Sequence, residues 1–327
     1  MIKSLEDLNR TSKLAETGQY AAVVSHLSDR SQTDLSESPT LALLFGMAQA
    51  RLGRHSEGTR WVEVALDRSR DRGDRAIEAR ALNDRGAIAL VTGNIDEAAS
   101  YFTQALAAAE READHATVGR CSNNLGIINN LSGQYARAIG SYTMAIAAFQ
   151  QAGHRRGIAE TRPNLAITYR DQGELQRALD EADRAVEEAE RVDDPTLFAQ
   201  VLTVRAEIRL MLGEPLLAQH EVKRALNTHR ELGNEVEEAQ DLRVLANTLA
   251  ATEKEDEAEQ ILRDVAERAI DLNRPLLAAD TTRDLARLFR ESGRNSEARE
   301  TAQAARVLFN QLGAVAEIRK IDKMFRQ

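Results

Sequence analysis

The chain has 327 residues and a formal net charge of −9, and 43% of its residues are hydrophobic although only 4% are aromatic. This charge balance excludes the concentrated basic surface that general nucleic-acid binding needs. Cys121 is the only cysteine, which excludes an internal disulfide and favours a reducing compartment. No apolar run is long enough to span a bilayer, and the N-terminus has no signal-peptide core. We expect a cytoplasmic protein with no nucleic-acid and no membrane partner.

Residues 1–38 predict a degenerate first hairpin followed by a polar linker. The hairpin turns at Gly18, and its second helix has an apolar stripe formed by Tyr20, Val23, Val24 and Leu27. The linker, residues 31–39, is polar and turn-like, and we expect it to be the most flexible joint of the chain. Within it, Ser38 is a plausible helix cap and Pro39 a plausible first helical residue.

Residues 39–312 predict seven helical hairpins with a period of 40. Glycine marks the turn inside every hairpin except the one at Glu253, which we expect to be looser: Gly53, Gly93, Gly133, Gly173, Gly213 and Gly293. Links between hairpins follow the same period, at Gly73, Ala113, Gly153, Asp193, Gly233, Asn273 and Gly313. Small residues recur inside the first helices, where neighbouring helices must approach closely: Gly46, Gly86, Gly126, Ala166, Ala206, Ala246 and Ala286. One hairpin cannot bury both of its faces, so the repeats must stack.

The hairpin of residues 123–150 shows the pattern most completely. After Gly133, steps of three and four place one apolar stripe on a helix face: Tyr135, Ala138, Ile139, Tyr142, Ala145, Ile146 and Phe149. Before the turn, Leu125, Ile128 and Leu131 form a second stripe.

The order Leu125-Gly126, Gly133, Tyr135, Ala138, Tyr142 and Ala145 resembles the tetratricopeptide repeat, and Leu165-Ala166, Tyr169, Gly173, Ala178 and Ala185 repeat it. The resemblance extends over residues 4–312. The commoner repeat has about 34 residues, whereas this period is similar to the long-helix variety of kinesin light chains and of the sensor domain of the maltose-regulon activator. The resemblance implies an all-α fold, a right-handed superhelical solenoid of about eight antiparallel helix hairpins with a C-terminal capping helix.

Two further segments follow from local chemistry. Pro195, Pro215 and Pro275 stand near helix starts, where a missing N–H costs nothing, but Pro163 lies inside the helix expected over 155–172 and should bend it. Residues 313–327 carry apolar positions at helical spacing, namely Val315, Ile318, Ile321, Met324 and Phe325. We expect a terminal helix that covers the exposed face of the last hairpin.

Signatures of catalysis are missing from the sequence. It contains no glycine-rich phosphate loop, HExxH, paired CxxC or GxSxG. The six histidines are scattered without metal-ligand spacing: His26, His55, His115, His154, His220 and His229. We expect His115 and His154 to be exposed, Cys121 to be a packed thiol, and the protein to be no enzyme and to need no metal or cofactor.

The family resemblance assigns the residue before the repeated Leu, and the residue four before it, to a concave groove. These positions are Asp84, Asn124 and Asn164, with Arg80, Arg120 and Glu160 one turn earlier, and the groove is extended by Asn123, Asn130 and Arg170. Asparagine amides suit the backbone of an extended peptide and arginines suit its carboxylates. An alternative is that the Asn row only serves packing between repeats.

Farther along the chain the same row becomes Val204, Val244 and Asp284, which predicts a more apolar patch. We expect the charges that follow to pair with one another at the surface: Asp280, Arg283, Asp284, Arg287 and Arg290.

Three functions fit these patterns. The first is a non-enzymatic scaffold that binds a peptide or helical segment of a partner protein in the groove. The second is a ligand- or peptide-sensing regulatory module, resembling peptide-pheromone receptors, whose effector would be a separate chain or lie outside this sequence. The third is self-assembly into a homo-oligomer through the terminal hairpins, which would give a mass in solution above 36.2 kDa.

Overall fold

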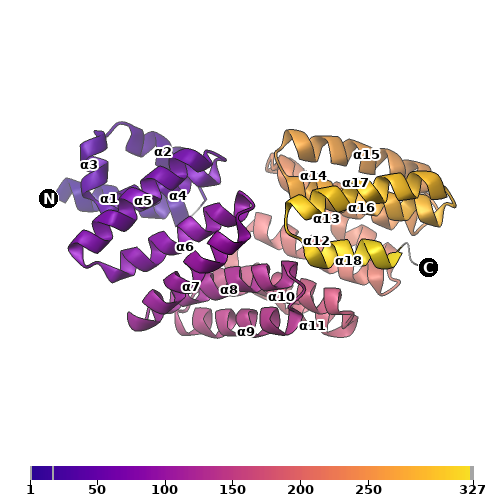
Figure 1. Cartoon of the computed structure of the whole chain (residues 1–327), viewed down its shortest axis with the longest axis horizontal. Coiled ribbons are helices and arrows are strands. Elements are labelled where there is room, and N and C mark those ends of the chain that lie inside the picture. Colours follow the sequence, from indigo (N-terminus) through magenta and orange to yellow (C-terminus); the bar gives the residue numbers. More distant parts are fainter. Residues whose placement is uncertain (1, 17, 325–327) are drawn as a thin grey trace. The chain divides into compact units, whose positions relative to one another are not determined.

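The computed structural model describes residues 2–16 and 18–324, and every regular element in these ranges is an α-helix. Of these helices, none combines the length and the apolar composition that crossing a bilayer would take. In chain order (Figure 1) they are α1 (Ile2–Glu16), α2 (Tyr20–Ser28), α3 (Gln32–Glu37), α4 (Pro39–Arg51), α5 (His55–Arg72), α6 (Arg75–Val91), α7 (Ile95–Arg111), α8 (His115–Leu131), α9 (Tyr135–Gln151), α10 (Arg155–Gln172), α11 (Leu175–Val192), α12 (Pro195–Met211), α13 (Pro215–Glu231), α14 (Glu235–Ala250), α15 (Glu255–Asp271), α16 (Pro275–Glu291), α17 (Asn295–Gln311) and α18 (Val315–Met324).

Consecutive helices pack as hairpins, which confirms the predicted all-α repeat fold. Helix α4 packs on α5, α6 on α7, and the pattern continues through α10–α11, α12–α13, α14–α15 and α16–α17. First helices of successive hairpins also contact each other directly, as α10 does with α12, α12 with α14, and α14 with α16. A charged residue on a first helix can therefore reach the equivalent helix of the next repeat.

The turn inside each hairpin has one backbone design. At Gly133 the φ angle is +74°, and the N–H of Gln134 donates to the carbonyl of Asn129 at 2.8 Å. Glu253 adopts φ +64°, and the N–H of Lys254 donates to the carbonyl of Leu249 at 3.0 Å. The expectation of a looser hairpin at Glu253 is therefore wrong, because the surrounding helices hold this non-glycine residue in the left-handed conformation despite its steric cost.

The segment expected to be a flexible, turn-like linker contains a helix, α3. The side chain of Ser31 caps it by accepting from the N–H of Asp34 at 3.1 Å, and Leu35 is buried. Arg72 of α5 donates to the carbonyl of Glu37, which ties the end of α3 to the next hairpin. The sequence reasoning missed the helix because one buried leucine in a polar stretch gives almost no periodicity.

Prolines behave largely as expected. Pro39, Pro195, Pro215 and Pro275 each stand at the start of a helix, and Ser38 caps α4. Pro163 is buried inside α10, whose helical assignment continues through it from Arg155 to Gln172.

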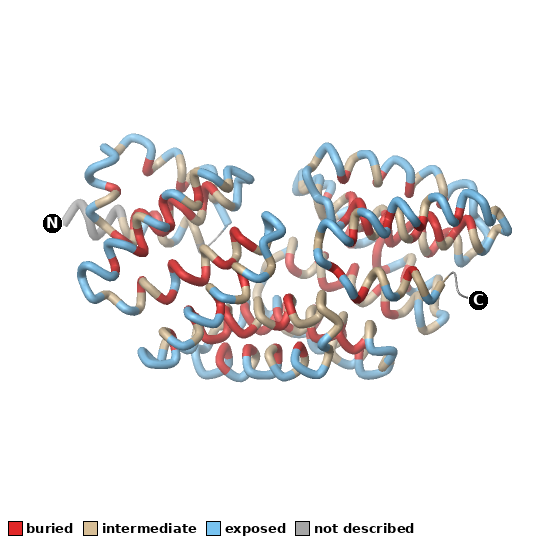
Figure 2. Tube along the Cα trace, in the orientation of Figure 1, coloured by how far each residue is buried: buried red, intermediate tan, exposed pale blue. Residues whose placement is uncertain are grey.

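The described chain divides into two compact units, residues 1–125 with 147–152 (unit 1) and residues 126–146 with 153–327 (unit 2). In unit 1 the core includes Phe45 and Trp61, whose rings meet edge to face at 5.4 Å. In unit 2 the largest fully buried side chains include Phe289 and Phe309. Buried positions recur along the faces on which helices meet (Figure 2).

Helix α18 covers the last hairpin as predicted. Ala314 and Ile321 are buried in one apolar cluster with Phe309 of α17, and Leu131, the last residue of α8, packs against the same cluster. Phe325, which we placed on the same stripe, lies outside the described residues. Unit 2 thus brings its C-terminal helix back to the end of α8.

Close approach inside the hairpins explains the recurring small residues. A Cβ added to Gly126 would lie 2.5 Å from Cε1 of Tyr142 and 2.8 Å from its Cζ. Gly140, on α9, is exposed and would place a Cβ in open space.

We predict that Gly126→Ala lowers the free energy of unfolding by about 1–3 kcal/mol, because the added methyl forces the Tyr142 ring out of its packed position. Gly140→Ala is the matched control and should raise it by about 0.5–1 kcal/mol through helix propensity alone. Urea unfolding followed by circular dichroism measures both changes. Equal effects of the two substitutions would contradict the close packing of α8 on α9.

Candidate binding surfaces

The predicted groove residues of unit 1 gather on two neighbouring first helices. Arg80 and Asp84 lie on α6, and Arg120, Asn123 and Asn124 lie on α8. Asn124 Nδ2 donates to Asn83 Oδ1 at 3.2 Å, and Asn83 Nδ2 donates to Asp84 Oδ1 at 3.2 Å. We call this set, with Asn83 and Asp114 added, the α6–α8 patch. Sequence reasoning missed Asn83, which is adjacent to Asp84 and whose side chain contacts Asn124 of the neighbouring repeat.

Arginines surround the carboxylates of the α6–α8 patch. Arg80 Nε lies 3.3 Å from Asp114 Oδ2, and Arg120 donates to Thr117 Oγ1 at 3.1 Å. Burial raises the pKa of Asp84 above its ordinary value, although Arg120, Asn83, Arg51 and Arg80 all act to lower it. The patch therefore combines cations, an amide row and a half-buried carboxyl whose charge is poorly solvated.

The predicted residues of unit 2 separate into two groups. Glu160 is exposed and pairs with Arg156 of its own helix at 2.8 Å, and Asn164 Nδ2 donates to the carbonyl of Glu160 at 3.3 Å. Asn130 and Arg170 instead take part in contacts that cross unit 2. The nine predicted residues are thus not one uniform ladder.

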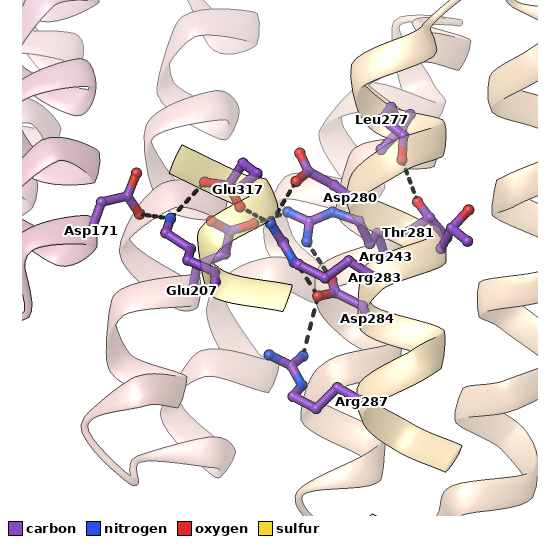
Figure 3. A network of polar contacts seen from close by, with 12 residues as sticks. Asp171, Glu207, Arg243, Leu277, Asp280, Thr281, Arg283, Asp284, Arg287 and Glu317 are labelled. Atoms are coloured by element: carbon purple, nitrogen blue, oxygen red, sulfur yellow. Dashed lines mark hydrogen bonds and ion pairs between the residues drawn. The ribbon is translucent and has the colours of Figure 1, made fainter. Parts of the chain in front are cut away.

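Eight side chains of unit 2 form a closed ring of ion pairs with alternating charge. Around the ring they are Arg170, Glu207, Arg243, Asp284, Arg283, Glu317, Lys320 and Asp171, which pairs again with Arg170. The residues come from α10, α12, α14, α16 and α18. Figure 3 shows Glu317 of α18 lying between Asp171 and Arg283. We call this set the charge ring.

The charge ring is largely withdrawn from water. The side chains of Asp284, Arg243 and Asp171 are only 1%, 6% and 6% exposed. Neutral amides supply further bonds: Asn130 donates to Asp171 at 3.3 Å, and Asn247 donates to Asp284 at 2.8 Å. Buried charges are tolerated because each has an oppositely charged neighbour and additional hydrogen bonds.

The ring corrects two expectations. Charges of α16 do pair with one another, since Arg283 contacts both Asp280 and Asp284, but Asp284 is buried rather than at the surface. The row of Val204, Val244 and Asp284 was expected to give a more apolar patch, but polar contacts continue beside it. Glu207 lies one turn after Val204 and pairs with Arg243, the residue before Val244. Glu207 and Arg243 lie on the first helices of neighbouring hairpins, so residue spacing within one helix could not predict their pairing.

Opposite charges shift the pKa values of ring residues so that the charged form is favoured: downward for the two aspartates and upward for the lysine. Burial acts to raise the pKa of Asp284, but Arg287, Arg243 and Arg283 outweigh it and hold that pKa well below its ordinary value. For Asp171, burial is likewise outweighed by Arg170 and Lys320, so its pKa is lowered. Burial acts to lower the pKa of Lys320, but Asp171 and Glu317 raise it overall. Asp284, Asp171 and Lys320 are therefore ionised at neutral pH.

A second buried polar cluster joins three helices of unit 2. His229 Nδ1 of α13 lies 2.7 Å from Asp241 Oδ2 of α14, and Thr203 of α12 donates to Asp241 Oδ1. Burial acts to lower the pKa of His229, but the hydrogen bond and charge of Asp241 raise it overall. The side chains of His229 and Asp241 are 0% and 1% exposed, so the cluster can join helices but cannot meet a substrate.

Metal-ligand groups and the single cysteine bear on whether residues 2–16 and 18–324 could support catalysis. No three His, Cys, Asp or Glu side chains in these ranges are placed to hold a metal ion. Cys121 is buried and its thiol contacts Asn83 Oδ1 at 3.6 Å. Burial raises the pKa of this thiol to about 12, which makes it a packed group rather than a nucleophile and agrees with the expectation.

We predict that Asp284→Asn lowers the free energy of unfolding at pH 7 by about 3 kcal/mol or more, since it removes the buried carboxylate that Arg243, Arg283 and Arg287 share. The wild-type contribution of Asp284 is present above its unfolded pKa of about 3.9 and is lost as pH falls toward its depressed folded pKa. The difference between the two proteins should therefore shrink between about pH 5 and pH 2. Urea unfolding at several pH values measures it, and a difference that is constant with pH would contradict an ionised ring.

The chain is similar to known helical repeat proteins in sequence and in fold. The family model described as "Tetratricopeptide repeat" matches residues 78–151 and 120–192. No curated protein matches the sequence. Among solved structures, a Rap protein complexed with competence and sporulation factor is 14% identical, with 99% of each chain covered and a TM-score of 0.65.

Two further structures are similar over most of the chain. The Rap conjugation gene regulator of plasmid pLS20, in complex with the Phr* peptide, is 16% identical, with 86% of this chain and 76% of that chain covered and a TM-score of 0.70. Aspartyl phosphate phosphatase F from Bacillus subtilis is 14% identical, with 85% and 72% covered and a TM-score of 0.70. At these identities the likeness shows a common fold.

Proposed function

We propose that the chain, in which a tetratricopeptide-repeat model matches residues 78–151 and 120–192, is a non-enzymatic interaction scaffold that binds a peptide segment of another protein on the α6–α8 patch. The observation that carries this proposal is the row of Asp84, Asn83 and Asn124 between flanking arginines on two adjacent first helices. Repeats of this kind can be added or lost without rebuilding a core, which suits a binding surface made of equivalent helix positions.

Chemistry of the α6–α8 patch fits an extended peptide with an acidic residue. An asparagine amide offers two donors and an acceptor, and the bond to Asn83 uses one of the donors of Asn124. The Arg80 side chain is 47% exposed and presents its guanidinium to solvent beside Asp114. A hydrogen bond to a charged group contributes about 1.5–3 kcal/mol and a neutral one about 0.5–1.5 kcal/mol. Micromolar binding requires roughly 8 kcal/mol, so several residues of the patch must act together.

Two structures of similar fold support a peptide as the ligand class. One is described as a Rap protein complexed with competence and sporulation factor, and the other as a regulator in complex with the Phr* peptide. They also favour a second candidate for this chain, a peptide-sensing regulatory module whose effector is another protein. In either case Asn130 and Arg170 are less suited to the ligand than predicted, since the charge ring already engages them.

The proposal is tested by selecting peptides against the purified chain from a displayed random library and measuring their affinity by fluorescence polarisation. We predict that Arg120→Ala with Asn124→Ala weakens binding roughly 30-fold or more, since one charged and one neutral bond are lost. Arg80→Glu should weaken acidic peptides most. Arg137→Ala is the matched control, because Arg137 is an exposed residue of α9 that lies outside the α6–α8 patch and donates to Gln134 Oε1 at 2.7 Å.

Circular dichroism must show equal helicity in all variants. Peptides that bind the double variant and the parent equally would assign binding to another face and contradict the proposal. A mass in solution above 36.2 kDa that falls on substitution of the terminal helices would instead favour self-assembly.

A further inference from the structure

Helix α18 is a short element that touches several distant parts of unit 2. It has ten residues, of which Ala316 and Ile321 are buried. Glu317 pairs with Arg283 of α16, and Lys320 Nζ lies 3.0 Å from Asp171 Oδ1 of α10. Ala316 also lies beside the α8–α9 turn, where a Cβ added to Gly133 would be 3.4 Å from the Ala316 Cβ. The helix therefore occupies a surface built from the end of α8 and from α10, α16 and α17.

Asp171 and Arg283, which pair with Lys320 and Glu317 of α18, each have another partner on α8, α10 or α16. Asp171 contacts Arg170 at 3.0 Å and accepts from Asn130 at 3.3 Å. Arg283 contacts Asp280 at 2.9 Å and Asp284 at 3.3 Å. Within α18, Glu317 and Lys320 pair with each other at 2.6 Å. Breaking a buried ion pair is strongly unfavourable when it leaves a charge unpaired, but departure of α18 leaves both Asp171 and Arg283 paired. Arg306 of α17 loses its contact with Asp322 at 3.5 Å, but its side chain is 48% exposed and so remains solvated.

The apolar anchoring of α18 is also small. Ile321 is its one large buried side chain, Ile318 is half-buried, and Val315 is 45% exposed. An isolated helix of about ten residues is only marginally stable in water, so α18 is helical because it is docked. Docking and folding of this segment are thus one equilibrium, which a competing helix can shift.

We propose that the surface beneath α18 is a helix-binding site for a second protein, and that α18 occupies this site until the partner helix displaces it. The docked helix α18 defines the chemistry of the partner: an amphipathic helix with a small residue followed directly by an acid, a base three positions after the acid and an aliphatic residue four positions after it. In α18 these are Ala316, Glu317, Lys320 and Ile321. The site contains none of the residues of the α6–α8 patch and does not depend on the peptide function proposed there.

The variant Glu317→Lys with Lys320→Glu, made in the whole 327-residue chain, is designed to undock α18 from the surface beneath it. It preserves the net charge and the i,i+3 pair of α18, but it puts a lysine opposite Arg283 and a glutamate opposite Asp171. Lys323→Glu is the control, because Lys323 is exposed and lies outside the charge ring. Three labelled synthetic peptides serve as probes. One has the sequence of residues 313–324, one has the acid and base exchanged, and one is an unrelated helix that keeps only the four defining residues.

In the charge-exchanged variant we expect amides of 315–324 to lose their protection from hydrogen exchange while helices α4–α16 keep theirs. The native-sequence peptide and the unrelated four-residue helix should then bind this variant at least about tenfold more tightly than they bind the wild-type chain, where docked α18 leaves only a small competent fraction. The exchanged peptide should not bind the variant. The Lys323→Glu control should behave as wild type.

Several results would overturn the proposal. Continued protection of 315–324 in the variant would show that the ring contacts do not hold α18. Loss of helicity throughout the variant would make α18 an integral part of the core. Equal binding of the native and exchanged peptides would remove the stated partner chemistry. A wild-type dimer that disappears in the variant would assign the surface to α18 of a second copy rather than to a separate partner.

Discussion

The series of buried ion pairs from Arg170 to Arg283 is the constraint on which unit 2 depends. The pairing of Lys320 with Asp171 closes this series by joining the last described helix to α10, the first helix of a hairpin much earlier in the chain. Between these two residues, each first helix contributes charges that meet those of the next repeat. An open stack of hairpins needs contacts only between neighbours. Closing the charge ring adds a long-range requirement, since a small change in the angle between any two repeats would separate Lys320 from Asp171.

Burial makes that requirement stringent. A charged group taken from water and left without a partner costs several kcal/mol, whereas a fully paired one is close to neutral for stability. The ring therefore contributes less to the total stability than to the choice of one arrangement, because other repeat angles would leave Arg243 or Asp284 unpaired in a dry environment. His229 and Asp241 impose a similar condition on α13 and α14. By contrast, the α6–α8 patch keeps its arginines partly exposed, which is the state expected of residues that meet a ligand.

The repeat fold was predictable because its requirements are local. The positive φ at Gly133 restricts one position, and the packing of Tyr142 on Gly126 restricts another, since a Cβ added to Gly126 would lie 2.5 Å from Cε1 of Tyr142. Such restrictions recur every 40 residues. Glu253 and α3 show where this reasoning stops, because the tertiary environment held a non-glycine residue in a left-handed turn and one buried leucine sufficed to dock a helix. Of the α6–α8 patch, Asp84 and Asn124 were proposed from the family resemblance, but their hydrogen-bond partner Asn83 was not. The ring could not be found, since the pairing of Asp171 with Lys320 depends on the accumulated angles of all intervening hairpins.

The most direct test of this account is a disulfide between the α8–α9 turn and α18. In the variant Gly133→Cys with Ala316→Cys, the two Cβ atoms would lie about as close as disulfides require, since the built Cβ of Gly133 is 3.4 Å from that of Ala316. Gly173→Cys with Ala316→Cys is the control, because Gly173 occupies the equivalent turn one repeat later and faces open space. We predict rapid intramolecular oxidation of the first pair, with Cys121 remaining a buried thiol, and none in the control. Thiols that stay reduced in the first pair, or oxidise equally in both, would contradict the closure of unit 2 by α18.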